Sequence, residues 1–176
     1  IMMPLPTRKI TKMSFFLALA LVLHLVEAFL PPLPLPGVRL GLANIVTLAV
    51  LALAGSGPAL TVSLLRVLLG SLLAGTFGAT AFWLSLAGAA ASFLVMAALW
   101  RLPRPRFGFL GLSIAGAMSH NLAQLLAYSL LAGLRGLSAY ALLSAGAAIP
   151  TGLVVGYLAY WLCRLERRIE FVGFAR

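Results

Sequence analysis

The chain alternates long apolar runs with short breaks that are polar or rich in proline and glycine. Six runs are predicted to be helices, at residues 13–30, 38–54, 58–76, 80–100, 108–131 and 137–163. They reach the roughly 17–25 residues that a helix needs to cross a bilayer, with 38–54 near the minimum. The pattern predicts an all-α integral membrane protein, a bundle of six transmembrane helices in one domain that comprises residues 1–176.

The breaks between the runs contain residues that end or begin helices. Residues 31–37 read PPLPLPG, a stiff extended connection, and residues 55–58 read GSGP, a turn whose proline can start the next helix. Pro150 lies inside the sixth run and is expected to kink or split that helix. The basic tail after Cys163 fits an amphipathic segment on the membrane surface and equally the solvated end of the last helix.

Composition supports a membrane protein and explains the positive charge. The chain is 62% hydrophobic and 9% charged, with a mean hydropathy of +1.09 and a net charge of +10. Most basic residues flank the apolar runs, which indicates membrane topology rather than nucleic-acid binding. In a six-span arrangement the N-terminus, residues 101–106 and the C-terminus share one side, so both termini are predicted to be cytoplasmic.

A short set of polar residues interrupts the predicted spans. Ionisable side chains are costly inside a membrane and by default indicate function. Helical rise places the set in one layer from the midplane outward, and spacings of three or four residues let members of one helix share a face. We predict that these side chains line a common ligand cavity. The set comprises His24, Glu27, Asn44, Arg66, His120, Asn121 and Gln124, with Arg39 at the outer end of the second run.

Arg66 is the central member of this set, and two interpretations of it remain open. In the first, a buried ion pair with Glu27, the one acidic residue inside the spans, only sets helix packing. In the second, Arg66 faces an anionic group in a cavity open toward the outside, with Glu27 as its resting counter-ion. The two interpretations are compatible, because a ligand can break a stored pair.

Other chemistry is weakly indicated. His24, His120 and one glutamate on two helices are a poor match to a metal site, and the single Cys163 excludes an internal disulfide and a cysteine-rich metal centre. We therefore predict no metal and no cofactor. Residues 152–156 form a GxxxG motif, which indicates close helix packing inside the bundle, with oligomerisation as the alternative. The chain has no GxxxxGK[ST] motif, so energy for any transport would come from a partner or an ion gradient.

The segments RLGLANI, LLRVLLGSLL and SHNLAQ resemble a bacterial membrane family known as Gx transporters and also described as heptaprenyl diphosphate synthase component I. The resemblance covers about residues 14–160. The layout is also similar to the substrate-binding S components of energy-coupling factor transporters, six-helix bundles whose ligand sites open to the outside. The resemblance implies a multi-pass protein of the bacterial inner membrane. It also implies that the residues of the family motifs belong to the functional site; here they are Arg39, Asn44, Arg66, His120, Asn121 and Gln124.

Two departures from these families bear on function. The AxxxA signature that many S components carry in their first helix is not clear in FFLALALVLHLVEA, which leaves docking to an energising membrane partner in question. Prenyl diphosphate synthases hold magnesium with paired aspartates, and this chain has no aspartate. We therefore predict a protein that is not itself an enzyme.

Three functions follow from the sequence. The first is a transport protein that binds a small or amphiphilic anion. The second is an accessory subunit of polyprenyl diphosphate synthesis that binds or translocates a polyprenyl phosphate or a similar isoprenoid. The third is a bundle whose polar layer is purely structural. A cavity reaching the outer face would favour the first, a lateral opening between helices the second, and the absence of a cavity the third.

Overall fold

Each predicted run corresponds to a helix in the computed structural model, which describes residues 5–29, 41–102, 108–133 and 138–174. All the secondary structure in these ranges is helical, which confirms the prediction of six helices. They are α1 (Leu5–Phe29), α2 (Asn44–Ala54), α3 (Ser56–Leu73), α4 (Thr80–Trp100), α5 (Phe109–Ala132) and α6 (Ser138–Phe174). The proline-rich stretch 31–37 and Arg39 lie outside the described residues.

Three helices differ in length from the prediction. α1 begins at Leu5 rather than at residue 13, and α6 continues to Phe174 rather than ending at residue 163. Apolar windows detect only the part of a helix that fits hydrocarbon, whereas lysine, arginine and glutamate continue a helix well in water. The basic tail is therefore the end of α6 and not a separate segment. α2 is shorter than predicted and begins at Asn44.

Pro150 does not split α6, so that part of the prediction is wrong. The helix is one element from Ser138 to Phe174 with Pro150 inside it. Proline removes a single backbone hydrogen bond, and its ring is exposed on the outside of the bundle, where it displaces no core side chain. The hydroxyl of Thr151 donates to the carbonyl oxygens of Ala147 and Ala148, 3.2 Å away in each case.

The short helix α2 lies at the centre of the bundle. It contacts each of the other five helices, and its residues from Asn44 to Leu51 are all buried. Around it, α3 packs on α1 and α4, and α5 packs on α4 and α6. Gly55 alone separates α2 from α3, with a φ of 89° in the region that favours glycine. The chain thus reverses where the sequence predicts a turn, but the turn is Gly55 alone, and α3 begins at Ser56 rather than at Pro58.

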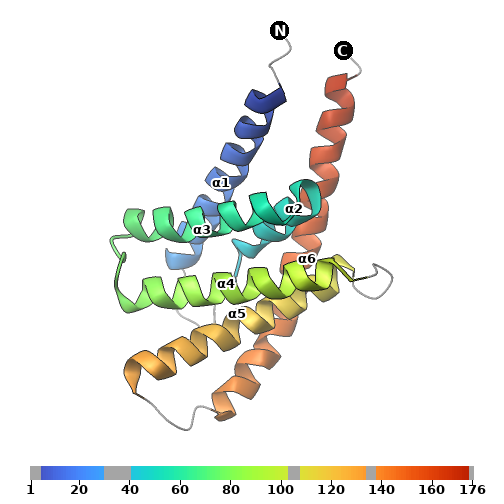
Figure 1. Cartoon of the computed structure of the whole chain (residues 1–176). Helices are drawn as coiled ribbons and strands as arrows, with labels where there is room; N and C mark the ends of the chain where they lie inside the picture. The colour runs from blue at the N-terminus through green and yellow to red at the C-terminus, as the bar shows by residue number, and fades with distance from the viewer. Residues whose placement is uncertain (1–4, 30–40, 103–107, 134–137, 175–176) are drawn as a thin grey trace.

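Two helices project beyond the stack formed by α3, α4 and α5. Figure 1 shows that the start of α1 and the end of α6 extend from the same end of the bundle. There the Lys12 Nζ lies 2.7 Å from Glu166 Oε1 and joins the two helices. This arrangement agrees with termini on one side of a membrane, while the cytoplasmic assignment remains a prediction.

The helices have the character of a multi-pass membrane protein. Four are long and apolar enough to cross a bilayer: Lys9–Glu27, Ser56–Leu73, Thr80–Trp100 and Tyr140–Arg168. α2 has 11 residues and is about 16 Å long, roughly half the thickness of the hydrocarbon core. α5 has 24 residues but carries the polar groups His120, Asn121 and Gln124. The structure therefore supports four spans by composition, against the six that the sequence predicts.

The GxxxG motif at residues 152–156 packs inside the bundle. A Cβ atom added to Gly152 would lie 2.6 Å from the Cα of Ile114 on α5. One added to Gly156 would lie 2.9 Å from the Cβ of Ser113. Both glycines thus let the backbones of α5 and α6 approach closely, and the prediction of intramolecular packing is confirmed.

Candidate functional site

The predicted polar layer is buried inside the bundle. Arg66 is 4% exposed and Gln124 is 1% exposed, and His24, Asn44, His120 and Asn121 are buried as well. Small hydroxyl side chains that the sequence analysis did not single out are buried beside them. They are Thr47, Ser63, Ser71, Ser85, Ser92, Ser113 and Ser144. Their recurrence at helical spacing on α3 and α4 was the available signal, but such residues also serve close helix packing.

Arg66 on α3 meets His24 on α1. The distance between Arg66 Nη1 and His24 Nδ1 is 3.4 Å. A guanidinium carries only donors, so Nδ1 must accept, which requires the His24 tautomer with its proton on Nε2. Gly70, one turn further along α3, makes room for the ring: a Cβ added there would lie 2.9 Å from His24 Nε2. The contact therefore places a permanent positive charge on α3 beside an imidazole on α1.

Glu27 does not pair with Arg66, so the predicted ion pair is wrong. In the described part of the chain no ion pair joins these two side chains. The Glu27 carboxylate instead accepts hydrogen bonds from the backbone nitrogens of Gly41, at 2.6 Å, and Leu42, at 3.2 Å. These N–H groups lie just before α2, where the helix has no acceptors for them. The spacing of side chains in a sequence does not show that these backbone N–H groups need an acceptor and will bind the Glu27 carboxylate in place of Arg66.

We expect Glu27→Ala to destabilise the protein by removing this cap. Two buried or half-buried N–H groups would lose a charged acceptor, which costs about 1–3 kcal/mol. The matched control is Glu166→Ala, which removes the partner of Lys12 at the projecting helix ends and should cost at most about 1 kcal/mol. Thermal unfolding of the purified protein in detergent measures both. Equal shifts for the two variants would show that Glu27 does not stabilise the start of α2.

A second polar group lies between α4, α5 and α6. His120 and Gln124 on α5 face Gly88 on α4, where an added Cβ would lie 2.7 Å from His120 Cε1 and 2.9 Å from Gln124 Cγ. The side-chain nitrogen of Asn121 donates to the backbone oxygen of Ser144 on α6, at 3.4 Å. Among the described residues, neither the nitrogen nor the oxygen of the Gln124 amide has a hydrogen-bond partner. Gln124 thus offers a donor and an acceptor to a ligand.

The contact between α3 and α4 relates the two polar groups. Val67, which follows Arg66, packs in a buried cluster with Phe82 and Ala89 of α4. Ala89 is the neighbour of Gly88, which contacts His120 and Gln124. The cationic side of the layer and its amide side therefore lie on adjacent helices. Asn44 lies at the start of α2, close to Gly41, whose backbone nitrogen donates to Glu27.

The described residues contain no group of three or more histidine, cysteine, aspartate or glutamate side chains that could hold a metal ion. The buried polar side chains form two groups, one with a guanidinium and an imidazole and the other with an imidazole and two amides. This set can bind an anion through charge and hydrogen bonds.

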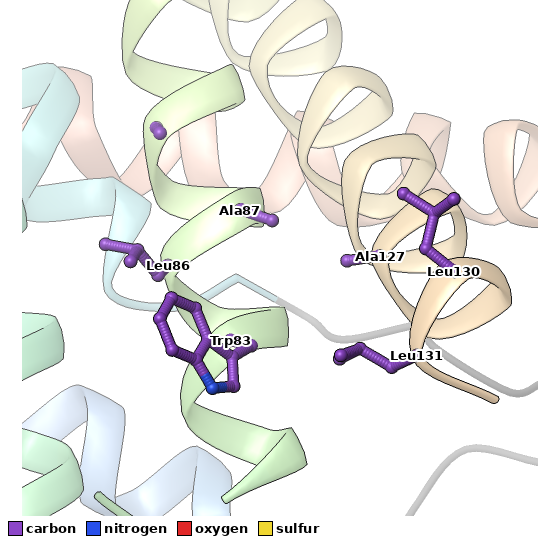
Figure 2. Close-up of a pocket in the computed structure, with 7 residues that line it drawn as sticks. Trp83, Leu86, Ala87, Ala127, Leu130 and Leu131 are labelled. Atoms are coloured by element: carbon purple, nitrogen blue, oxygen red, sulfur yellow. The ribbon is translucent and has the colours of Figure 1, made fainter. Parts of the chain in front are cut away.

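An apolar pocket opens between α4 and α5, and the sequence analysis did not predict it. Its volume is about 330 Å³. Figure 2 shows Ala87 on α4 opposite Ala127 on α5, and Trp83 on α4 opposite Leu131 on α5. The lining is completed by Leu86, Ala90 and Leu130. An alanine-rich stretch in a helix usually indicates close packing, so a pocket was not predictable there from the residue types.

The fold and the buried layer define a multi-pass α-helical membrane protein with a polar interior. Residues 16–162, most of the chain, match the family described as heptaprenyl diphosphate synthase component I, and the chain belongs to this family. The family resemblance found in the sequence is thereby confirmed. No curated protein and no solved structure matches the chain in the corresponding comparisons.

Proposed function

We propose that this protein binds an anionic amphiphile within the bacterial inner membrane and takes part in its transport, in the manner of an S component. The observation that carries the proposal is the buried guanidinium of Arg66 in a layer that also contains imidazole and amide groups. A charge in this position costs several kcal/mol and is usually retained for function. The planar guanidinium suits a phosphate or carboxylate, which it can bind through two parallel hydrogen bonds.

The partners of Arg66 and Glu27 support a ligand role. The acid that was expected to serve as counter-ion is engaged by the backbone before α2. A nitrogen of His24 lies 3.4 Å from Arg66 Nη1. Arg66 itself brings a permanent positive charge into this buried region, and such a charge suits an anionic group. Gln124 on α5 has a buried amide donor and acceptor without a hydrogen-bond partner among the described residues, and both are available to a ligand.

The proposed role is binding without catalysis. The chain contains no aspartate and three glutamates in total. Of these, Glu27 caps α2 and Glu166 pairs with Lys12. Diphosphate chemistry assisted by magnesium needs several carboxylate oxygens around the ion. We therefore place prenyl transfer, if it involves this family member, on a partner protein.

Substitution of Arg66 tests the proposal. We expect Arg66→Met to weaken binding of farnesyl diphosphate, an anionic amphiphile, by about 30-fold or more, because a charge-assisted bidentate contact is lost. Arg66→Lys should retain part of the affinity, because it keeps the charge and loses the planar fork. Binding is measured by titration of the detergent-solubilised protein. Farnesol, which has the same chain and no anionic group, should bind Arg66→Met and the natural protein alike.

The matched control is Arg101→Met, at the exposed end of α4, which removes one positive charge away from the layer. It should leave the affinity for farnesyl diphosphate unchanged. If Arg66→Met stays folded and binds as tightly as the natural protein, Arg66 is not the anion site and the proposal fails.

The second candidate is an accessory subunit of polyprenyl diphosphate synthesis. The family description and the lateral apolar pocket between α4 and α5 both favour it. Reconstitution into vesicles distinguishes the two candidates, with a fluorescent polyprenyl phosphate as probe. Movement of the probe between leaflets supports transport, whereas saturable binding without movement supports the accessory role.

A further inference from the structure

The pocket between α4 and α5 lies directly beside the polar layer. Ala87, in its wall, precedes Gly88, whose Cα faces the side chains of His120 and Gln124. Gly88 has no side chain, so the side chains of His120 and Gln124 lie directly against the backbone of α4, next to the residue that lines the pocket. The pocket and this part of the polar layer therefore lie along the same contact between α4 and α5.

The face of α5 continues from the polar layer into the pocket. Ala127 follows Gln124 by three residues and Leu131 follows it by seven, a spacing that stacks side chains on one helix face. Gln124 is 1% exposed, and in the described residues its amide atoms have no hydrogen-bond partner. A molecule lying along this face would meet an amide at one end and a wholly apolar surface at the other.

The chemistry of the pocket fits a hydrocarbon chain. Its lining comprises leucine and alanine side chains and one tryptophan (Figure 2). Its volume of about 330 Å³ lies within the range of about 300–1,000 Å³ typical of small-molecule sites. α4, which forms one wall, is among the four helices suited to a membrane, so the pocket meets the bilayer from the side. Water-soluble ligands would gain little from such a surface.

We infer that this pocket is the chain-binding subsite of the anionic ligand, and that the ligand reaches the polar layer laterally, from the bilayer, between α4 and α5. The inference rests on the proposed function, an anionic amphiphile as ligand, and adds the place where its hydrocarbon chain binds and the side from which it enters. Gln124 lies on the same face of α5 as the pocket residues Ala127 and Leu131, which favours this ligand over a second copy of the protein. A helix packed on the outer face would leave the buried amide of Gln124 without a hydrogen-bond partner.

Filling the pocket tests the inference. Ala90→Phe places a ring in the space between α4 and α5, and Ala98→Phe makes the same change at an exposed position of α4 outside the pocket. The probes are farnesyl diphosphate and dimethylallyl diphosphate, which share the anionic group and differ in chain length. Ala90→Phe should weaken farnesyl diphosphate binding tenfold or more, because buried methylene contacts are lost. Dimethylallyl diphosphate should bind both variants and the natural protein equally.

The outcomes separate this inference from the proposed function. If Ala90→Phe leaves farnesyl diphosphate binding unchanged while Arg66→Met abolishes it, the anion site stands and the chain subsite is overturned. An equal loss for both diphosphates also overturns it, since the ring then disturbs the polar layer itself. A changed oligomeric state with unchanged affinity would assign the pocket to a contact between copies. If Arg66→Met and Ala90→Phe both bind like the natural protein, the proposed function fails as well.

Discussion

Gly152→Ala is expected to destabilise the protein by roughly 2–3 kcal/mol or more, although it adds a single methyl group. The added Cβ would lie 2.6 Å from the Cα and 3.0 Å from the backbone nitrogen of Ile114. These are backbone atoms of α5 and cannot rotate away as a side chain can, so α5 and α6 would have to separate. Overpacking of this kind typically costs 1–3 kcal/mol even where side chains can adjust.

Gly146→Ala is the matched control for this prediction. Gly146 lies on the same helix, is exposed, and has nothing within 4 Å of an added Cβ. Its replacement should leave stability unchanged or raise it by up to about 1 kcal/mol, because alanine favours helix. Cys163 provides the readout: it is the single cysteine and is 4% exposed, so a thiol-reactive dye reports thermal opening of the bundle. Equal melting temperatures for the two variants would contradict the close α5–α6 contact.

Gly70→Ala is expected to lower both stability and anion binding. An added Cβ would overlap the His24 ring, with Cδ2 as the nearest atom and Nε2 at 2.9 Å. The ring must move, and its movement breaks the 3.4 Å contact between His24 and Arg66. We expect a loss of about 1–3 kcal/mol in unfolding free energy and weaker binding of farnesyl diphosphate.

A double-mutant cycle makes this prediction specific. In a His24→Ala background the ring is absent, so Gly70→Ala should cost much less than it does in the natural protein. The two sites would then show a coupling energy of about 1 kcal/mol or more. Gly57→Ala serves as control, since Gly57 is an exposed residue of α3 with nothing within 4 Å of an added Cβ. Additive effects of the His24 and Gly70 substitutions would show that the ring does not lie over Gly70.

The sequence predicted the helices well because apolar periodicity and helix-ending residues are local signals. α4 has the predicted bounds, residues 80–100, and the reversal at Gly55 was visible from its glycines and proline. The length of α2 was not predictable in this way. The residues before Asn44 are as apolar as those after it, and only the position of Glu27 identifies where the backbone needs an outside acceptor.

The candidate site was predicted in membership but not in its pairings. Arg66 and Gln124 are buried as expected, because polar residues inside apolar runs must face inward. The partner of Arg66 was missed, since a helix start competes for Glu27 and a glycine on α3 admits His24 instead. The apolar pocket was missed for another reason. Whether alanines pack tightly or leave space depends on how far two helices diverge, and a single sequence does not encode that distance locally.

The central helix sets an order for biogenesis. α2 is too short to be held by lipid alone, yet it is enclosed by helices on both sides of it in the sequence. Because Gly55 is its only separation from α3, we expect the two to enter the bilayer as one hairpin anchored by the longer α3. α2 then waits for α4, α5 and α6 to be synthesised before its last faces are covered. α2 is thus synthesised before the helices α4, α5 and α6, and we expect it to become fully buried only when they have packed against it.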